Sequence, residues 1–117
     1  AVANDTGYDN VFSAQLEGVL DPGDVVVAIS ASGNSRNLVK AAEYAKTQGA
    51  VIVGLLGFDG GLLKGMCDAC VLVATPKGEY GPVEDVHMIL DHLMSSYFCF
   101  TARAGRVPAA PLQKGAA

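Results

Sequence analysis

The stretch VVVAISASGNSRNLVKAAEYA, residues 25–45, changes character in its middle and decides the fold. Its first residues form an apolar, β-branched run, which is typical of a parallel strand buried on both faces. Its last ten residues carry apolar side chains at the spacing of an amphipathic helix, and Gly49 follows as a helix stop. Between them lies the polar sequence SASGNS, residues 30–35. The stretch therefore predicts a strand, a loop and a helix over residues 36–47.

The rest of the chain alternates in the same way. Its patterns predict a helix over 11–20, a strand over 51–56, a short helix over 60–66, a strand over 70–74 and a final helix over 83–100. Short connections between alternating strands and helices imply right-handed crossovers and a parallel sheet, which is the α/β class. Residues 1–100 are predicted to form one domain and residues 101–117 a flexible tail. Because three strands make a thin sheet, the domain is expected to be N-terminally incomplete or completed by partners.

Composition narrows the possible partners and location. The chain has 117 residues, half of them apolar and 17% charged, which suits one globular domain. Its net charge of −4 disfavours nucleic acid and anionic membrane surfaces as partners. No apolar run approaches the roughly 20 residues that cross a membrane. Three cysteines, an odd number, without a visible secretory signal predict reduced thiols and a cytoplasmic location.

The loop 30–35 has the features of an anion site. Ligands of parallel α/β sheets bind beyond the carboxyl ends of the strands, where this loop lies. The following helix offers unpaired N–H groups, and three serine hydroxyls add donors. The alternative is that Asn34 or Ser35 merely caps the helix. The loop has neither a Gly-Lys-Ser/Thr nor a Gly-x-Gly-x-x-Gly pattern, so no nucleotide cofactor is expected and a sugar phosphate is favoured.

These residues carry a resemblance. SASGNS after an apolar strand resembles the phosphate loop of the sugar isomerase (SIS) domain family. From about residue 4 to 97, the chain is similar to its phosphoheptose isomerase branch, including the DGG turn at 59–61 and the final helix. The resemblance implies a three-layer αβα sandwich of the flavodoxin-like kind. It also implies isomerisation of sedoheptulose 7-phosphate, a homotetramer with active sites at subunit interfaces, and zinc as a cofactor.

Position by position, the resemblance implies the residues that hold the substrate. The family's substrate-contacting Asn-Asp pair falls on Asn4 and Asp5. Its phosphate-binding positions fall on Ser30, Ala31, Ser32 and Ser35. Ala31 stands where threonine is common, so one side-chain hydroxyl is lost there.

The final helix is predicted to carry the chemistry. His92 matches the family's catalytic and zinc-binding histidine, and Glu84 stands where the family usually has a glutamine that contacts substrate or metal. Both are therefore candidate catalytic and metal-binding residues. Eight residues separate them, which places them roughly 80° apart around a helix, so that both could face one cleft. Histidine suits proton transfer near neutral pH, although a lone helix histidine is more often a surface or core-edge residue.

The resemblance covers what looks like the C-terminal two-thirds of the family's domain. The family's other catalytic groups, a glutamate and a nearby histidine, lie in an N-terminal segment that this sequence does not contain. The chain alone is therefore not expected to complete an acid–base pair. The alternative function is a non-catalytic SIS module that binds a phosphosugar as a regulator, or a protein partner, as a replication-initiator-binding relative does.

Other chemistry-bearing residues are predicted to be structural. His87 is expected to be a surface or supporting residue. Cys67 and Cys70 have CxxC spacing but no second pair, so buried thiols are favoured over zinc. Asp85 and Asp91 are expected on the solvated face of the final helix, and residues 59–61 form a turn.

Overall fold

The computed structural model describes residues 2–105 and has three strands among them. The elements in chain order are helix α1 (Val2–Thr6), 3-10 helix η1 (Tyr8–Asn10), α2 (Ser13–Leu16), β1 (Val25–Ser30), α3 (Arg36–Thr47), β2 (Val51–Gly57), α4 (Gly61–Lys64), β3 (Ala69–Val73) and α5 (Tyr80–Arg103). The strands lie in the order β1-β2-β3 and all pairs are parallel. The predicted α/β class is confirmed.

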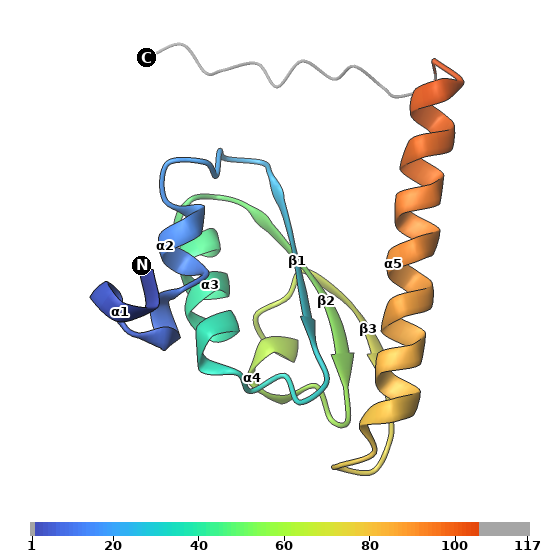
Figure 1. Ribbon diagram of the computed structural model, residues 1–117, viewed down its shortest axis with the longest axis horizontal. Helices are drawn as coiled ribbons and strands as arrows, with labels where there is room; N and C mark the ends of the chain where they lie inside the picture. The colour runs from blue at the N-terminus through green and yellow to red at the C-terminus, as the bar shows by residue number, and fades with distance from the viewer. Residues whose placement is uncertain (1, 106–117) are drawn as a thin grey trace.

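The strand register brings three loops to one edge of the sheet. Val25 lies opposite Val51, and Val53 lies opposite Ala69, so the strands run side by side to similar ends. Their carboxyl ends point to the same edge, at the bottom of Figure 1. The loops that follow β1, β2 and β3 therefore meet, as they do at ligand sites in parallel sheets.

Helices cover both faces of the sheet, but unequally. The helices α3 and α4 pack on one face, and α5 stands against the other (Figure 1). The core lies under α3, where small residues allow close approach; its buried members are Ala42, Ala45, Ala50, Ile52, Leu56 and Leu63. On the other face α5 buries only Val83 and His87. The second helical layer is therefore thin.

The expectation that the first strand is buried on both faces was wrong. On the α5 side of β1, Val25, Val27 and Ile29 are all exposed, while Ala28 and Ser30 on the other face are buried. The physical reason is that α5 contacts β2 and β3 but leaves most of β1 uncovered. The apolar run of β1 therefore forms a surface that the other described residues leave uncovered.

Two predicted helices differ in length from those observed. The helix expected over 11–20 is only α2, because the extended backbone of Glu17 (φ −59°, ψ 125°) ends it. The final helix begins at Tyr80, with Pro82 in its first turn, where proline costs no hydrogen bond. It continues past residue 100 to Arg103, and the remainder of the predicted tail, 106–117, lies outside the described residues. Of residues 2–105, no helix combines the length and apolar character needed to cross a membrane.

Candidate phosphate-binding site

The loop 30–35 is shaped by its own serines. The hydroxyl oxygen of Ser30 accepts a hydrogen bond from the Gly33 amide at 3.0 Å. The hydroxyl oxygen of Ser32 accepts one from the Asn34 amide at 3.3 Å. Neither serine donates its own hydroxyl hydrogen to a group within residues 2–105. Both hydroxyls can therefore donate to a ligand.

The first turn of α3 also has free donors. The backbone amides of Ser35, Arg36 and Asn37 make no hydrogen bond within residues 2–105. Ser35 occupies the N-cap position, but its side chain makes no capping hydrogen bond. Capping of α3 therefore does not explain the presence of a serine at residue 35. Because a helix N-terminus carries about half a positive charge, these amides suit an anion.

The turn at 59–61, predicted only as a turn, supports this loop. The Asn34 side chain accepts a hydrogen bond from the Leu62 amide at 3.1 Å and donates one to the Ser32 carbonyl at 2.9 Å. The Leu63 amide donates to the Gly33 carbonyl at 3.0 Å. Gly33 has a φ of +64°, and a Cβ there would lie 1.9 Å from the Gly60 carbonyl oxygen. The two loops pack so closely that only glycine fits at residue 33.

The three loops at the carboxyl edge enclose a hollow of about 210 Å³. Its lining residues are Ser32, Asn34, Phe58, Asp59, Thr75 and Lys77. Phe58, Thr75 and Lys77 were not among the predicted site residues; the only sequence signal for them is that each closely follows the end of a strand. Phe58 has a φ of +53°, which is uncommon for a bulky residue, and its ring packs edge-on against Tyr80 at 5.1 Å.

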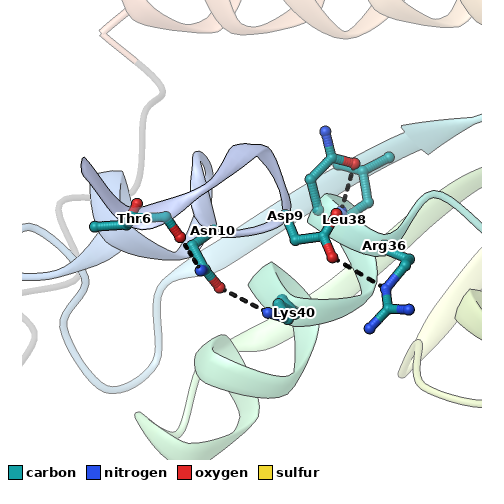
Figure 2. A network of polar contacts seen from close by, with 7 residues as sticks. Thr6, Asp9, Asn10, Arg36, Leu38 and Lys40 are labelled. Atoms are coloured by element: carbon teal, nitrogen blue, oxygen red, sulfur yellow. Dashed lines mark hydrogen bonds and ion pairs between the residues drawn. The ribbon is translucent and has the colours of Figure 1, made fainter. Parts of the chain in front are cut away.

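The structure does not bring Asn4 and Asp5 to this hollow. Both are exposed on α1 and neither lines it. The N-terminal segment is held on α3 by the Asp9–Arg36 ion pair at 3.1 Å and by a hydrogen bond from Lys40 to Asn10 at 2.9 Å (Figure 2). The Asn10 side chain also donates to the Thr6 carbonyl. These contacts fix the position of the segment but do not turn its Asn-Asp pair toward residues 30–35.

Ala31 contributes only its backbone to the site. A Cβ at Gly57 would lie 2.7 Å from the Ala31 carbonyl oxygen and 2.5 Å from Val83, so β2, this loop and α5 meet at that glycine. The alanine side chain offers no hydrogen-bonding group. At this position the loop loses a donor but keeps its close packing.

The two predicted site residues of α5, Glu84 and His92, lie on different sides of the helix. Glu84 is exposed and lines a groove of about 370 Å³ with Ile29, His87, Met88 and Asp91; His92 is exposed and does not line that groove. His92 lies nine residues after the buried Val83, which places it about 180° around the helix. It therefore faces away from the sheet of its own chain, and the expectation of one shared cleft is not met within this chain.

The structure excludes one of the two alternatives for His87, a surface position, and contradicts the prediction that both Cys67 and Cys70 are buried. His87 is buried rather than at the surface, with 5% of its area exposed, and its Nε2 atom has no hydrogen-bond partner within residues 2–105. Cys67 is partly buried, and this burial raises the pKa of its thiol, with smaller contributions from Cys70 and Asp68. Cys70 is exposed, because its strand, β3, lies at the edge of the sheet.

The residues present do not fit a zinc site. Within residues 2–105, no three side chains of His, Cys, Asp or Glu lie close enough together to hold a metal ion. Glu84 and His92 point in different directions from one helix, and a protein zinc site needs at least three ligands. No chemical step is therefore assigned to a metal.

Comparison with known proteins defines the class to which this fold and loop belong. A family model described as the SIS domain matches residues 1–57. The predicted resemblance to the SIS domain family is confirmed by this match and by the relatives described below.

Several proteins that the chain resembles over most of its length are phosphoheptose isomerases. The chain is 47% identical over 93 residues to the phosphoheptose isomerase of Fusobacterium nucleatum (80% of this chain, 47% of the relative). It is 39% identical over 109 residues to that of Trichlorobacter lovleyi (91% and 56%). The solved phosphoheptose isomerase of Neisseria gonorrhoeae has a TM-score of 0.71 at 37% identity, covering 80% of this chain and 52% of that structure. The chain thus spans about half the length of the curated relatives it matches.

Proposed function

We propose that this chain is part of a phosphosugar isomerase that interconverts sedoheptulose 7-phosphate and an aldose heptose 7-phosphate. The observation that carries the proposal is the loop 30–35 with the start of α3, where, within residues 2–105, two serine hydroxyl hydrogens and three backbone amides have no acceptor. The similarity to phosphoheptose isomerases supports the choice of sugar.

The phosphate would be held without any nucleotide-binding element. Ser30 and Ser32 donate through hydroxyl hydrogens that have no partner within residues 2–105, and the Ser35 hydroxyl and the first amides of α3 add further donors. Asn34 keeps the loop in this shape through its bonds to Leu62 and Ser32. The reaction is redox-neutral and transfers no phosphate, so it requires no nucleotide cofactor.

The isomerisation moves one proton between two adjacent carbons through an enediolate. A base removes the proton alpha to the carbonyl, and an acid protonates the developing oxyanion. We assign proton transfer to His92, and we assign contact with the substrate hydroxyls and positioning of the reacting carbons to Glu84. Asn4 and Asp5 are assigned to the sugar, which requires α1 to approach the loop when substrate binds.

Because His92 faces away from its own sheet, we place the complete site between copies of the chain. The exposed apolar side chains of α5 supply the contact; they include Ile89, Leu93, Tyr97 and Phe100. On the helix they form a stripe beside His92. A homotetramer built on this stripe, as the resemblance implies, would bring His92 to the substrate of a neighbouring copy. Zinc at Glu84 and His92 would need ligands from outside residues 2–105.

A second candidate is a phosphosugar-binding regulator without catalytic activity. It is favoured by the contrast between residues 30–35, two of which line the hollow, and His92, which lines neither that hollow nor the groove at Glu84. In this role the hollow would bind the sugar phosphate, and α5 would carry the signal to a protein partner.

One experiment separates the two functions. The full-length protein is incubated with sedoheptulose 7-phosphate, with and without zinc, and product is followed beside His92→Ala and a control, Asp85→Ala. We expect His92→Ala to lower kcat by at least about 100-fold and Asp85→Ala to leave it within about twofold, since Asp85 is exposed and lines neither hollow. Turnover that survives in His92→Ala contradicts the assigned role, and binding without turnover favours the regulator.

A further inference from the structure

A lysine from the loop after β3 lines the same hollow as the phosphate loop. Lys77 shares this lining with Ser32 and Asn34, although more than 40 residues separate it from them in the sequence. It is the only cation among the lining residues of the hollow in the described part of the chain. The one acidic lining residue, Asp59, already accepts a hydrogen bond from the Gly61 amide at 3.0 Å.

The loop that carries Lys77 is held at both ends. The Thr75 hydroxyl donates to the Glu79 carbonyl at 3.3 Å, and the Glu79 amide donates to the Pro76 carbonyl at 3.0 Å, which closes a tight turn around Lys77. At its exit, the Tyr80 ring packs on Phe58, itself a lining residue. These contacts keep the base of the lysine side chain beside the hollow, while its long stem leaves the ammonium group free to move.

The other cations near the loop are directed elsewhere. Arg36, the first residue of α3, pairs with Asp9, and Lys40 donates to Asn10 (Figure 2). Lys64 on α4 is exposed and does not line the hollow. Lys77 makes no ion pair within residues 2–105. It is therefore the cation most available to an anion at residues 30–35.

We infer that Lys77 is an anion-binding and specificity-determining residue of the proposed site, an inference that rests on the proposed function. Its ammonium group donates a charge-assisted hydrogen bond to the phosphate that residues 30–35 hold. It thereby replaces the side-chain donor that Ala31 does not provide. The site then selects a dianionic sugar phosphate over the corresponding free sugar, and its affinity falls as salt screens the ammonium charge.

The test compares Lys77→Met with Lys77→Arg and with a matched control, Lys64→Met, in the full-length protein. Sedoheptulose 7-phosphate, inorganic phosphate and unphosphorylated sedoheptulose are each titrated by calorimetry at low and high salt. For Lys77→Met we expect Kd for both phosphates to rise about tenfold, KM to rise with it, and kcat to stay within about twofold. Lys77→Arg should keep most of the affinity, and Lys64→Met should match the wild type. The salt dependence should be shallower in Lys77→Met.

The outcomes distinguish this inference from the proposed function. If Ser32→Ala weakens phosphate binding but Lys77→Met does not, the inference is overturned and the proposed function stands. If the wild type binds inorganic phosphate but not sedoheptulose 7-phosphate, the proposed function fails. The role of Lys77 is then supported if Lys77→Met raises Kd for inorganic phosphate and is overturned if it does not. If the wild type binds neither, both are overturned. A Lys77→Met variant with a lowered Tm and an equal loss for all ligands would assign the lysine a structural role and overturn the inference as well.

Discussion

The loop 30–35 and the distal part of α5 differ in how much of their environment this chain supplies. The loop is supported on two sides. The turn at 59–61 packs on one side, and the start of α5 meets the loop beside Gly57 of β2 on the other. Beyond His87, α5 has no buried residue, and most of its apolar side chains are exposed, with only Leu90 and Met94 half-buried. The proposed phosphate site is thus complete within the chain, while the proposed catalytic histidine lies on a surface that needs a partner. Substitutions in the loop should therefore impair phosphate binding, and substitutions in the distal part of α5 should impair assembly.

The largest effect is expected where the two loops touch. Gly33→Ala would place a Cβ 1.9 Å from the Gly60 carbonyl oxygen at a φ of +64°. Both loops would have to move, so we expect a loss of about 3 kcal/mol or more in the free energy of unfolding and loss of phosphate binding. Urea denaturation and calorimetry measure these. Gly78→Ala is the control, because its φ is also positive but no atom lies within 4 Å of its Cβ position; an equal loss there would contradict tight loop packing as the cause.

The next effect concerns the exposed stripe of α5. Leu93→Asp places a charge in the centre of the apolar surface, and we expect subunit association to weaken by more than about 100-fold, while the unfolding of the monomer is nearly unchanged. Sedimentation at several protein concentrations measures the association. The control Ser95→Asp lies on a different side of the helix and should assemble normally. An unchanged mass for Leu93→Asp would show that this stripe is not the contact.

A smaller effect is expected at Asn34. Asn34→Ala removes the hydrogen bonds to Leu62 and to Ser32 without adding bulk. Since the side chain is exposed, we expect a loss of about 1 kcal/mol in the free energy of unfolding and several-fold weaker phosphate binding. Gln15→Ala, which removes an exposed amide on α2, is the control and should bind phosphate normally. Full phosphate affinity in Asn34→Ala would mean that the loop keeps its shape without this support.

The smallest effect concerns the cysteines. Because burial raises the pKa of Cys67, less of its thiol is ionised near pH 8 than in the absence of that burial. Iodoacetamide followed by mass spectrometry should therefore label the exposed Cys70 and Cys99 before Cys67, and the lag should shrink as the pH rises. Labelling of Cys67 first would contradict the partly buried position of its side chain.

The elements that sequence reasoning predicted well are those with local signals. The observed bounds of α3 are the predicted ones, because a polar loop precedes it and Gly49, with a φ of +75°, follows it. The three strands were also located within one or two residues. In both cases the residues that define the element also border it, so no distant contact is needed to place it.

What could not be predicted depends on residues distant in the sequence. His87 and His92 are both histidines on α5, and only the packing of α5 on the sheet decides that the first is buried and the second exposed. Lys77 belongs to the hollow because three loops of fixed length meet, which no single motif encodes. One face of β1 is exposed because no element within residues 2–105 packs on it, and the apolar sequence of the strand does not reveal this.

The close approach of Val83 to Gly57 has a mechanical consequence. It anchors α5 near its start, beside the Ala31 carbonyl, while the other end of the helix lies about 30 Å away at 1.5 Å per residue. A tilt of about 5° at this pivot would move the far end by roughly 2.6 Å over that length. Conversely, a neighbouring copy that holds the far end of α5 to within about 1 Å fixes the direction of the helix axis to within about 2°. Assembly at one end of α5 would thus hold the backbone beside the phosphate loop nearly motionless at the other.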